Sequence, residues 1–175
     1  FDDGLKSNFD VALPLLEKFG FTGWFFIQTG FINTPVEGQP AFAKQHAING
    51  DRAMTWDEIR DLNQNHVIGC HTHSHLRMRK DLSLEILQTE ILESKKILEE
   101  QLAHRIDHFC WVGGELSTYT RQAHAFIQNA GYKYAFMTNS KPIAPETDPF
   151  FIDRTYVEPS WNVDEVSFML CGVID

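Results

Sequence analysis

The sequence predicts an α/β fold built on a parallel sheet that closes like a barrel. Short apolar runs alternate along the chain with amphipathic stretches of helical period, and no internal repeat or low-complexity tract interrupts them. The runs at Gly23–Ile27, Val67–Cys70 and Phe109–Val112 are apolar throughout. Strands of that kind are typical of parallel sheets covered on both faces, whereas strands exposed on one face alternate apolar and polar residues. Strand and helix in strict alternation indicate βαβ units.

The first half of the chain predicts two helices around one strand. From Ser7 to about Phe19 an apolar stripe recurs at helical spacing, and Gly20 ends it. A second helix begins at Thr55, where Glu58 three residues on forms a capping box. Between them, the segment from Gln28 to Met54 is expected to be a long loop that could wall a substrate groove.

The second half continues the alternation. The expected elements are a helix from Ser83 to about Leu102, a strand at Phe109–Val112, a helix from Thr118 to Ala130, strands at Lys133–Met137 and Phe151–Val157, and a short helix capped by Asn162.

Length and composition favour a single domain over residues 1–175. The chain has 175 residues, of which 43% are hydrophobic, enough for one sizeable core. A net charge of -9 argues against a nucleic-acid or anionic-membrane surface and fits an uncharged or cationic ligand. No apolar run reaches the roughly 20 residues that span a bilayer. Oligomeric state is left open.

Three cysteines, Cys70, Cys110 and Cys171, lack the spacing of a disulfide framework or a metal-binding CxxC pair, so we expect small buried hydrophobes. The chain starts without Met and without an apolar strand ahead of Asp2. We therefore expect a domain truncated at its N-terminus, with that strand and any signal peptide upstream. Because any signal peptide would lie upstream of this sequence, the sequence leaves the cellular location open.

The candidate site is the stretch from Gly69 to His75, which holds three histidines in five positions. An extended run puts His71, His73 and His75 on one face, and a helical turn puts His71 and His75 together. Two imidazoles leave a divalent ion short of ligands, so a carboxylate must come from elsewhere. Paired Asp2 and Asp3 are the best candidates, one binding metal while the other stays basic. Taken separately, an Asp-Asp-Gly run is more often a turn, and a histidine pair is often solvated surface.

Together, Asp2-Asp3-Gly4, His71-Thr72-His73-Ser74-His75 and the order of elements resemble the polysaccharide deacetylase family, also called the NodB homology or carbohydrate esterase family 4 domain. The resemblance implies a distorted (β/α)7 relative of the TIM barrel, with its site at the carboxyl ends of the strands. It further implies that Asp3, His71 and His75 hold one divalent ion and that Asp2 is the catalytic base. Zinc is the default metal, and cobalt, nickel or iron suit the same ligands. The family slightly favours the cell envelope or secretion.

The third motif of the family is divergent here, where the chain has Trp111-Val112-Gly113-Gly114-Glu115. Its usual Arg, Pro and second aromatic residue are missing. The resemblance gives the Gly113 amide a role in holding the oxyanion, and places Trp111 and Glu115 at the substrate. Arg154 is a candidate for the missing Arg partner of the catalytic carboxylate, with a surface ion pair as the equal alternative.

These residues favour a metal-dependent hydrolase that removes N-acetyl or O-acetyl groups from a polysaccharide, such as an N-acetylglucosamine polymer, peptidoglycan or a chitin-like glycan. One alternative is a non-catalytic glycan-binding module on the same scaffold. Another is a hydrolase of a small cyclic amide or ureide. The resemblance assigns protonation of the leaving amine to a histidine near the carboxyl end, and no histidine follows His124. We therefore expect Asp2 itself to return the proton, with a residue beyond Asp175 as the alternative.

Overall fold

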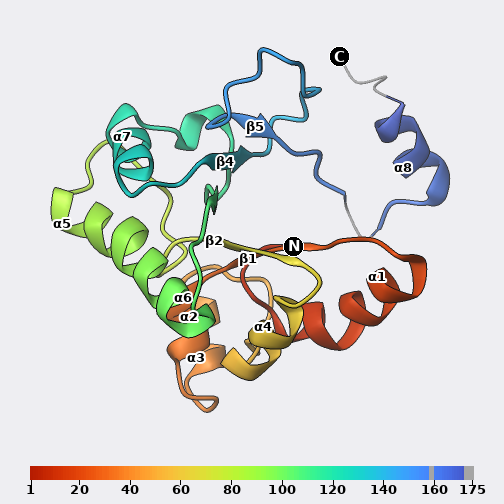
Figure 1. Ribbon diagram of the computed structural model, residues 1–175, viewed down its shortest axis with the longest axis horizontal. Coiled ribbons are helices and arrows are strands. Elements are labelled where there is room, and N and C mark those ends of the chain that lie inside the picture. The colour runs from red at the N-terminus through yellow and green to blue at the C-terminus, as the bar shows by residue number, and fades with distance from the viewer. Residues whose placement is uncertain (158–159, 172–175) are drawn as a thin grey trace.

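The computed structural model describes residues 1–157 and 160–171. Its centre is a five-stranded parallel sheet in the order β1-β2-β3-β4-β5 (Figure 1). The strands are β1 (Trp24–Ile27), β2 (Val67–Cys70), β3 (His108–Cys110), β4 (Tyr134–Met137) and β5 (Ile152–Asp153). The predicted α/β class and its parallel sheet are confirmed, whereas a closed barrel is not shown.

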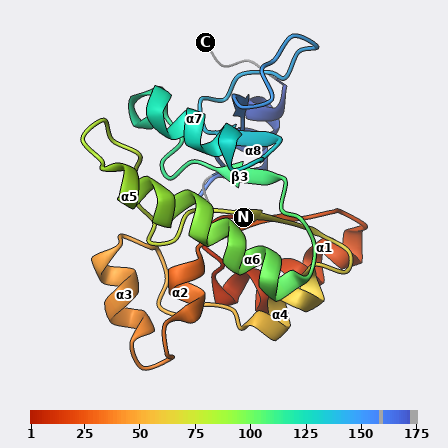
Figure 2. The same cartoon turned by 60° about the vertical axis from the view of Figure 1, so that its left-hand side comes forward.

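Helices fill the connections between the strands (Figures 1 and 2). They are η1 (Asn8–Ala12), α1 (Leu13–Phe19), α2 (Thr29–Asn33), α3 (Gln39–Gln45), α4 (Trp56–Leu62), α5 (Leu84–Leu87), η2 (Gln88–Glu93), α6 (Ser94–Leu102), η3 (Leu116–Thr118), α7 (Arg121–Asn129) and α8 (Val163–Leu170). Two of them, η1 and η2, are π-helical, and η3 is a 3₁₀ turn. None of the helices in the described part of the chain has the length and apolarity to cross a bilayer.

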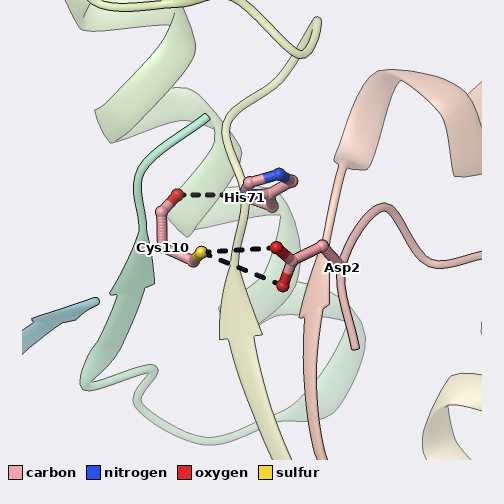
Figure 3. A group of neighbouring side chains, drawn as sticks. All are labelled: Asp2, His71 and Cys110. Atoms are coloured by element: carbon pink, nitrogen blue, oxygen red, sulfur yellow. Dashed lines mark hydrogen bonds between the residues drawn. The ribbon is translucent and has the colours of Figure 1, made fainter. Parts of the chain in front are cut away.

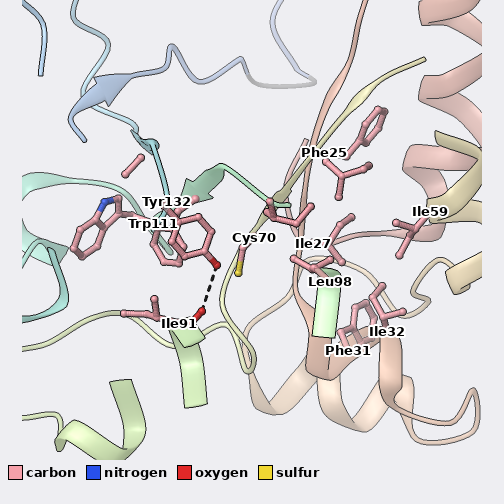
Figure 4. Close-up of a cluster of buried hydrophobic side chains, with 14 of the residues drawn as sticks. Phe25, Ile27, Phe31, Ile32, Ile59, Cys70, Ile91, Leu98, Trp111 and Tyr132 are labelled. Carbon is pink, nitrogen blue, oxygen red and sulfur yellow. Dashed lines mark hydrogen bonds between the residues drawn. The ribbon is translucent and has the colours of Figure 1, made fainter. Parts of the chain in front are cut away.

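The two faces of β1 separate the main core from the interior beneath the candidate site. Phe25 and Ile27 have no exposed surface and belong to the large hydrophobic cluster between the sheet and the helices (Figure 4). Phe26 points to the other face, where it packs with Cys110 and Phe136. This alternation follows from the period of two along a strand.

The chain begins beside β1. The Phe1 nitrogen donates to the Trp24 carbonyl at 2.8 Å, and the Phe1 carbonyl accepts from the Phe26 nitrogen at 2.8 Å. Bonds to alternate residues of a neighbour are the pattern of a parallel strand pair. Asp2 and Asp3 therefore leave from the edge of the sheet next to β1.

The prediction of a long loop from Gln28 to Met54 is wrong, since α2 and α3 lie within it. The Gln28 side chain accepts a hydrogen bond from the Phe31 nitrogen and so caps α2, while Phe31 is fully buried. Pro40 stands in the first turn of α3, where its missing N–H costs nothing. Burial of one aromatic ring, the cap at Gln28 and the proline in the first turn of α3 thus outweigh the polar composition of the segment.

Other predictions fare better. The capping boxes at Thr55 and Asn162 are both present. The helix expected after Ser83 is also present, with η2 as a π-helical segment in its middle. The strand expected at Phe151–Val157 is too long, because only the two residues of β5 pair with β4.

Candidate metal and catalytic centre

The candidate site lies at the carboxyl end of the sheet. His71 follows β2 directly, Gly113 follows β3 by three positions, and Arg154 follows β5 directly. The carboxyl ends of parallel strands share one edge, so residues far apart in the sequence meet there. Asp2 and Asp3 reach the same edge from beside β1.

Asp3, His71 and His75 form a group able to hold a cation. Their candidate ligand atoms all lie within 4.8 Å of one another. The Asp3 Oδ1 atom is 3.5 Å from His71 Nε2 and 3.3 Å from His75 Nε2. Asp3 adopts φ 71°, a left-handed conformation, and Gly4 continues the turn at φ 75°. The paired acids are thus part of a turn that also brings one carboxylate to two imidazoles.

Hydrogen bonds orient both imidazoles for ligation. His71 Nδ1 donates to the Cys110 carbonyl at 2.9 Å, and His75 Nδ1 donates to the His46 carbonyl at 2.7 Å. With the proton on Nδ1, each Nε2 carries its lone pair toward Asp3. Burial lowers the pKa of His71, against the opposing effect of the Asp2 and Asp3 charges, and this favours its neutral, ligating form.

The buried Asp3 Oδ1 accepts no hydrogen bond from any of the described residues. A buried carboxylate oxygen without a partner is costly and rare in folded proteins. Facing two Nε2 lone pairs, it is instead placed as an ion ligand would be. One carboxylate and two neutral imidazoles suit a divalent transition metal, so the residues fit the expected cofactor.

His73 lies outside this group. Its Nδ1 is 3.0 Å from Thr29 Oγ1, and its carbonyl accepts from the Gly30 nitrogen at 2.8 Å. Of the two arrangements left open by the sequence, the structure thus brings together His71 and His75 only.

Asp2 is held by Arg154, which is 152 positions away in the sequence. Arg154 Nη1 donates to Asp2 Oδ1 at 2.8 Å, and Nη2 donates to Oδ2 at 2.9 Å. Burial acts to raise the pKa of Asp2, but His71 and Arg154 outweigh it and hold that pKa well below its usual value. Arg154 is thus paired with Asp2 at the site, the first of the two alternatives that the sequence left open.

Cys110 lies beside Asp2 and His71 (Figure 3). The sequence predicted a small buried hydrophobe at this position and not a residue of the site. Its Sγ lies 3.8 and 3.9 Å from the two Asp2 oxygens, and Arg154 Nη2 donates to it at 2.8 Å. Asp2, His71 and Cys110 form a second group of possible ligands. Burial, reinforced by the Asp2 charge, raises the pKa of the Cys110 thiol well above its usual value. A protonated thiol beside a carboxylate already bound by Arg154 makes this the poorer cation site.

The turn after β3 contains a backbone donor that no described residue uses. Gly113 and Gly114 have φ +80° and +76°, and Thr138 fixes both by donating to the Gly113 carbonyl at 2.7 Å and the Gly114 carbonyl at 2.9 Å. No described residue accepts a hydrogen bond from the Gly113 N–H. Above the turn, Arg77 and Glu115 form an exposed ion pair of 3.7 Å. A Cβ at position 113 would lie 2.7 Å from Glu115 Oε2, so this pair occupies the space of the missing side chain.

The structure does not support Trp111 as a sugar-stacking residue. Its side chain is 1% exposed and packs against Phe109 and Tyr119, with ring centroids 6.0 and 5.4 Å away. The strand that presents Cys110 to the interior turns the next side chain toward the core, because the pleat alternates. Glu115, by contrast, is exposed beside the site.

The structure thus combines a parallel sheet with an Asp-His-His group and an Arg-bound Asp at the carboxyl edge of the sheet. The family model described as polysaccharide deacetylase matches residues 1–135. The chain therefore belongs to the polysaccharide deacetylase family.

Individual relatives are distant. YxkH of Bacillus subtilis (strain 168) is 22% identical over 163 residues, which are 93% of this chain and 51% of that protein. The chain thus spans about half the length of this curated relative. The Streptococcus pyogenes deacetylase PplD, solved in complex with acetate, matches with a TM-score of 0.77 at 18% identity, over 97% of this chain and 67% of that one. A de-N-acetylase from Aggregatibacter actinomycetemcomitans matches with the same TM-score and identity, over 97% and 72%. These likenesses establish the fold.

Proposed function

We propose that the chain is a metal-dependent deacetylase that hydrolyses N-acetyl groups on an amino-sugar polymer. The observation that carries the proposal is the unpartnered Asp3 Oδ1, which faces the Nε2 atoms of His71 and His75 beside an Asp2 carboxylate held by Arg154. Family membership supports the same activity. The chain's net charge of -9 suits a product that carries a free, cationic amine.

In this proposal Asp3, His71 and His75 hold one divalent ion, with zinc the default and cobalt, nickel or iron suited to the same ligands. Such an ion supplies a Lewis acid that polarises the acetyl carbonyl and acidifies water. The hydrogen bonds from each Nδ1 to a backbone carbonyl keep both imidazoles in the ligating tautomer.

Asp2 is the base. Arg154 occupies one lone pair on each Asp2 oxygen, and each oxygen retains a second lone pair for a proton. Asp2 takes a proton from the attacking water and returns it to the leaving amine, so one carboxylate serves both steps. Arg154 orients that carboxylate and keeps it ionised before attack.

The Gly113 N–H, which bonds to no other described residue, donates to the oxyanion that forms at the acetyl carbon. Glu115 and Arg77 flank that amide in place of an aromatic ring. In our proposal Glu115 contacts sugar hydroxyls next to the acetylated residue. Trp111 serves only to pack the strand.

Acetate release tests the proposal. Purified protein is stripped of metal and given acetylated chito-oligomers, peptidoglycan and an O-acetylated glycan, with and without added Zn²⁺ or Co²⁺. We expect acetate from at least one N-acetylated polymer, only with metal, and release slower by about 10²–10⁴-fold from the Asp2→Asn variant. Glycan binding without acetate release under every metal condition would favour the binding-module alternative. Turnover of a cyclic amide, with no acetate from any glycan, would favour the small-molecule alternative.

A further inference from the structure

The loop between the two histidine ligands adopts an unfavourable backbone. Thr72 has φ +68° and His75 has φ +56°, the left-handed region that residues with a Cβ rarely occupy. Two such residues within four positions persist only where the surroundings fix them. The His75 ring reaches Asp3 from this conformation, so whatever holds the loop also sets the ligand geometry.

Glu90 makes three hydrogen bonds to this loop. Its Oε2 accepts from the His73 nitrogen at 3.0 Å and from the Ser74 nitrogen at 2.8 Å, while Oε1 accepts from the Ser74 hydroxyl. The residue is 4% exposed, and no Lys or Arg among the described residues forms an ion pair with it. A buried carboxylate without a cation is costly to maintain, and here three donors of one loop compensate it.

The helix that carries Glu90 is irregular at that point. Glu90 lies in the π-helical segment η2, between α5 and α6, which run as one continuous helix (Figure 2). One turn later, the buried Ser94 hydroxyl donates to the Thr72 carbonyl at 2.9 Å. Single π-helical turns inside α-helices are frequently found at functional sites. One helix therefore holds the loop at Thr72, His73 and Ser74, all the residues between the two histidine ligands.

We propose that Glu90 is a positioning residue of the metal centre, which fixes the Thr72–Ser74 backbone so that His71 and His75 present Nε2 to Asp3. The inference rests on the proposed metal ligands. Glu90 touches neither substrate nor ion and acts through the loop. Removing its carboxylate leaves the His73 and Ser74 N–H groups without their acceptor. The loop then keeps the bonds from Thr29, Gly30 and Ser94 to the Thr72 and His73 carbonyls, but it loses its restraint at Ser74, next to the left-handed His75.

Metal affinity measures this role separately from turnover. We compare wild type with Glu90→Ala, Glu90→Gln and Glu93→Gln by competing Zn²⁺ against a chromophoric chelator and by recording the Co²⁺ absorption spectrum. Glu90→Ala should weaken Zn²⁺ binding by about 10–100-fold, the usual effect of losing an outer-shell partner, and alter the Co²⁺ spectrum. Glu90→Gln keeps one acceptor oxygen and should lose less. Glu93 is exposed on the same helix, so Glu93→Gln should match wild type.

The free energy of unfolding of each variant is measured in excess chelator. Without metal, this measurement separates a loss of general stability from an effect on the metal ligands. Glu90→Ala with wild-type Zn²⁺ affinity and Co²⁺ spectrum would overturn the proposal, as would an equal loss in Glu93→Gln. If Glu90→Ala does not fold, Ser74→Ala, which removes only the hydroxyl bond to Glu90, is expected to weaken Zn²⁺ binding several-fold, and an unchanged affinity would count against us. Wild type that binds Zn²⁺ but releases no acetate would refute the proposed activity and leave this test intact.

Discussion

Replacing His75 by Ala tests the metal centre most directly. The His75 Nε2 is 3.3 Å from the unpartnered Asp3 oxygen, and its side chain is 17% exposed. Its removal therefore takes away one ligand at little cost in packing. His71, which is 2% exposed, is the less clean choice, because His71→Ala would also leave a cavity in the interior.

The size of the effect follows from the number of ligands. Structural sites with four protein ligands bind Zn²⁺ with a free energy of about 10–16 kcal/mol at neutral pH, which is about 3 kcal/mol for each ligand. At roughly 1.4 kcal/mol per factor of ten, loss of one ligand weakens binding by about a hundredfold. His75→Ala should therefore raise the Zn²⁺ dissociation constant by about that factor. Chelator competition on metal-free protein measures it.

His73→Ala is the matched control, since it removes an imidazole from the same loop that bonds to Thr29 and not to Asp3. We expect its Zn²⁺ affinity to stay within about fivefold of wild type, because only one hydrogen bond of roughly 1 kcal/mol is at stake. Unchanged affinity in His75→Ala would refute the ligand assignment. So would a hundredfold loss in His73→Ala with His75→Ala unaffected.

Two further predictions concern the reaction. Asp2→Asn keeps the shape of the side chain but cannot accept a proton, so acetate release should fall by about 10²–10⁴-fold while metal content by elemental analysis is unchanged; near-normal turnover would eliminate Asp2 as the base. Gly113→Ala puts a methyl group against Glu115 at a residue with φ +80°. This should lower the free energy of unfolding, measured by denaturant titration, by about 1–2 kcal/mol. It should also displace the proposed oxyanion donor, so turnover should fall while the metal is retained. Full turnover of a destabilised Gly113→Ala protein would show that this amide is not needed.

The sequence by itself determined the buried strands β1 to β4, two helix starts and the pairs of acids and histidines that meet, but not α2 and α3. Apolar runs such as Gly23–Ile27 and Val67–Cys70 predicted buried parallel strands because burial on both faces leaves no polar alternation. The caps at Thr55 and Asn162 were readable since a cap depends on residues only three positions apart. His71 and His75 were grouped because both candidate backbone geometries put them on one side.

Only the tertiary structure decided which groups complete the site. Arg154 donates to Asp2, the Cys110 carbonyl accepts from His71, and Glu90 accepts from the loop between His71 and His75. These contacts span 152, 39 and 16 or 17 positions. No periodicity or local motif records such distances, because they follow from how the crossovers stack the strands and from which face each side chain takes. Trp111 is a further example. Its motif placed it beside the site, but the alternation of side chains along the strand buries it on the other face of the sheet.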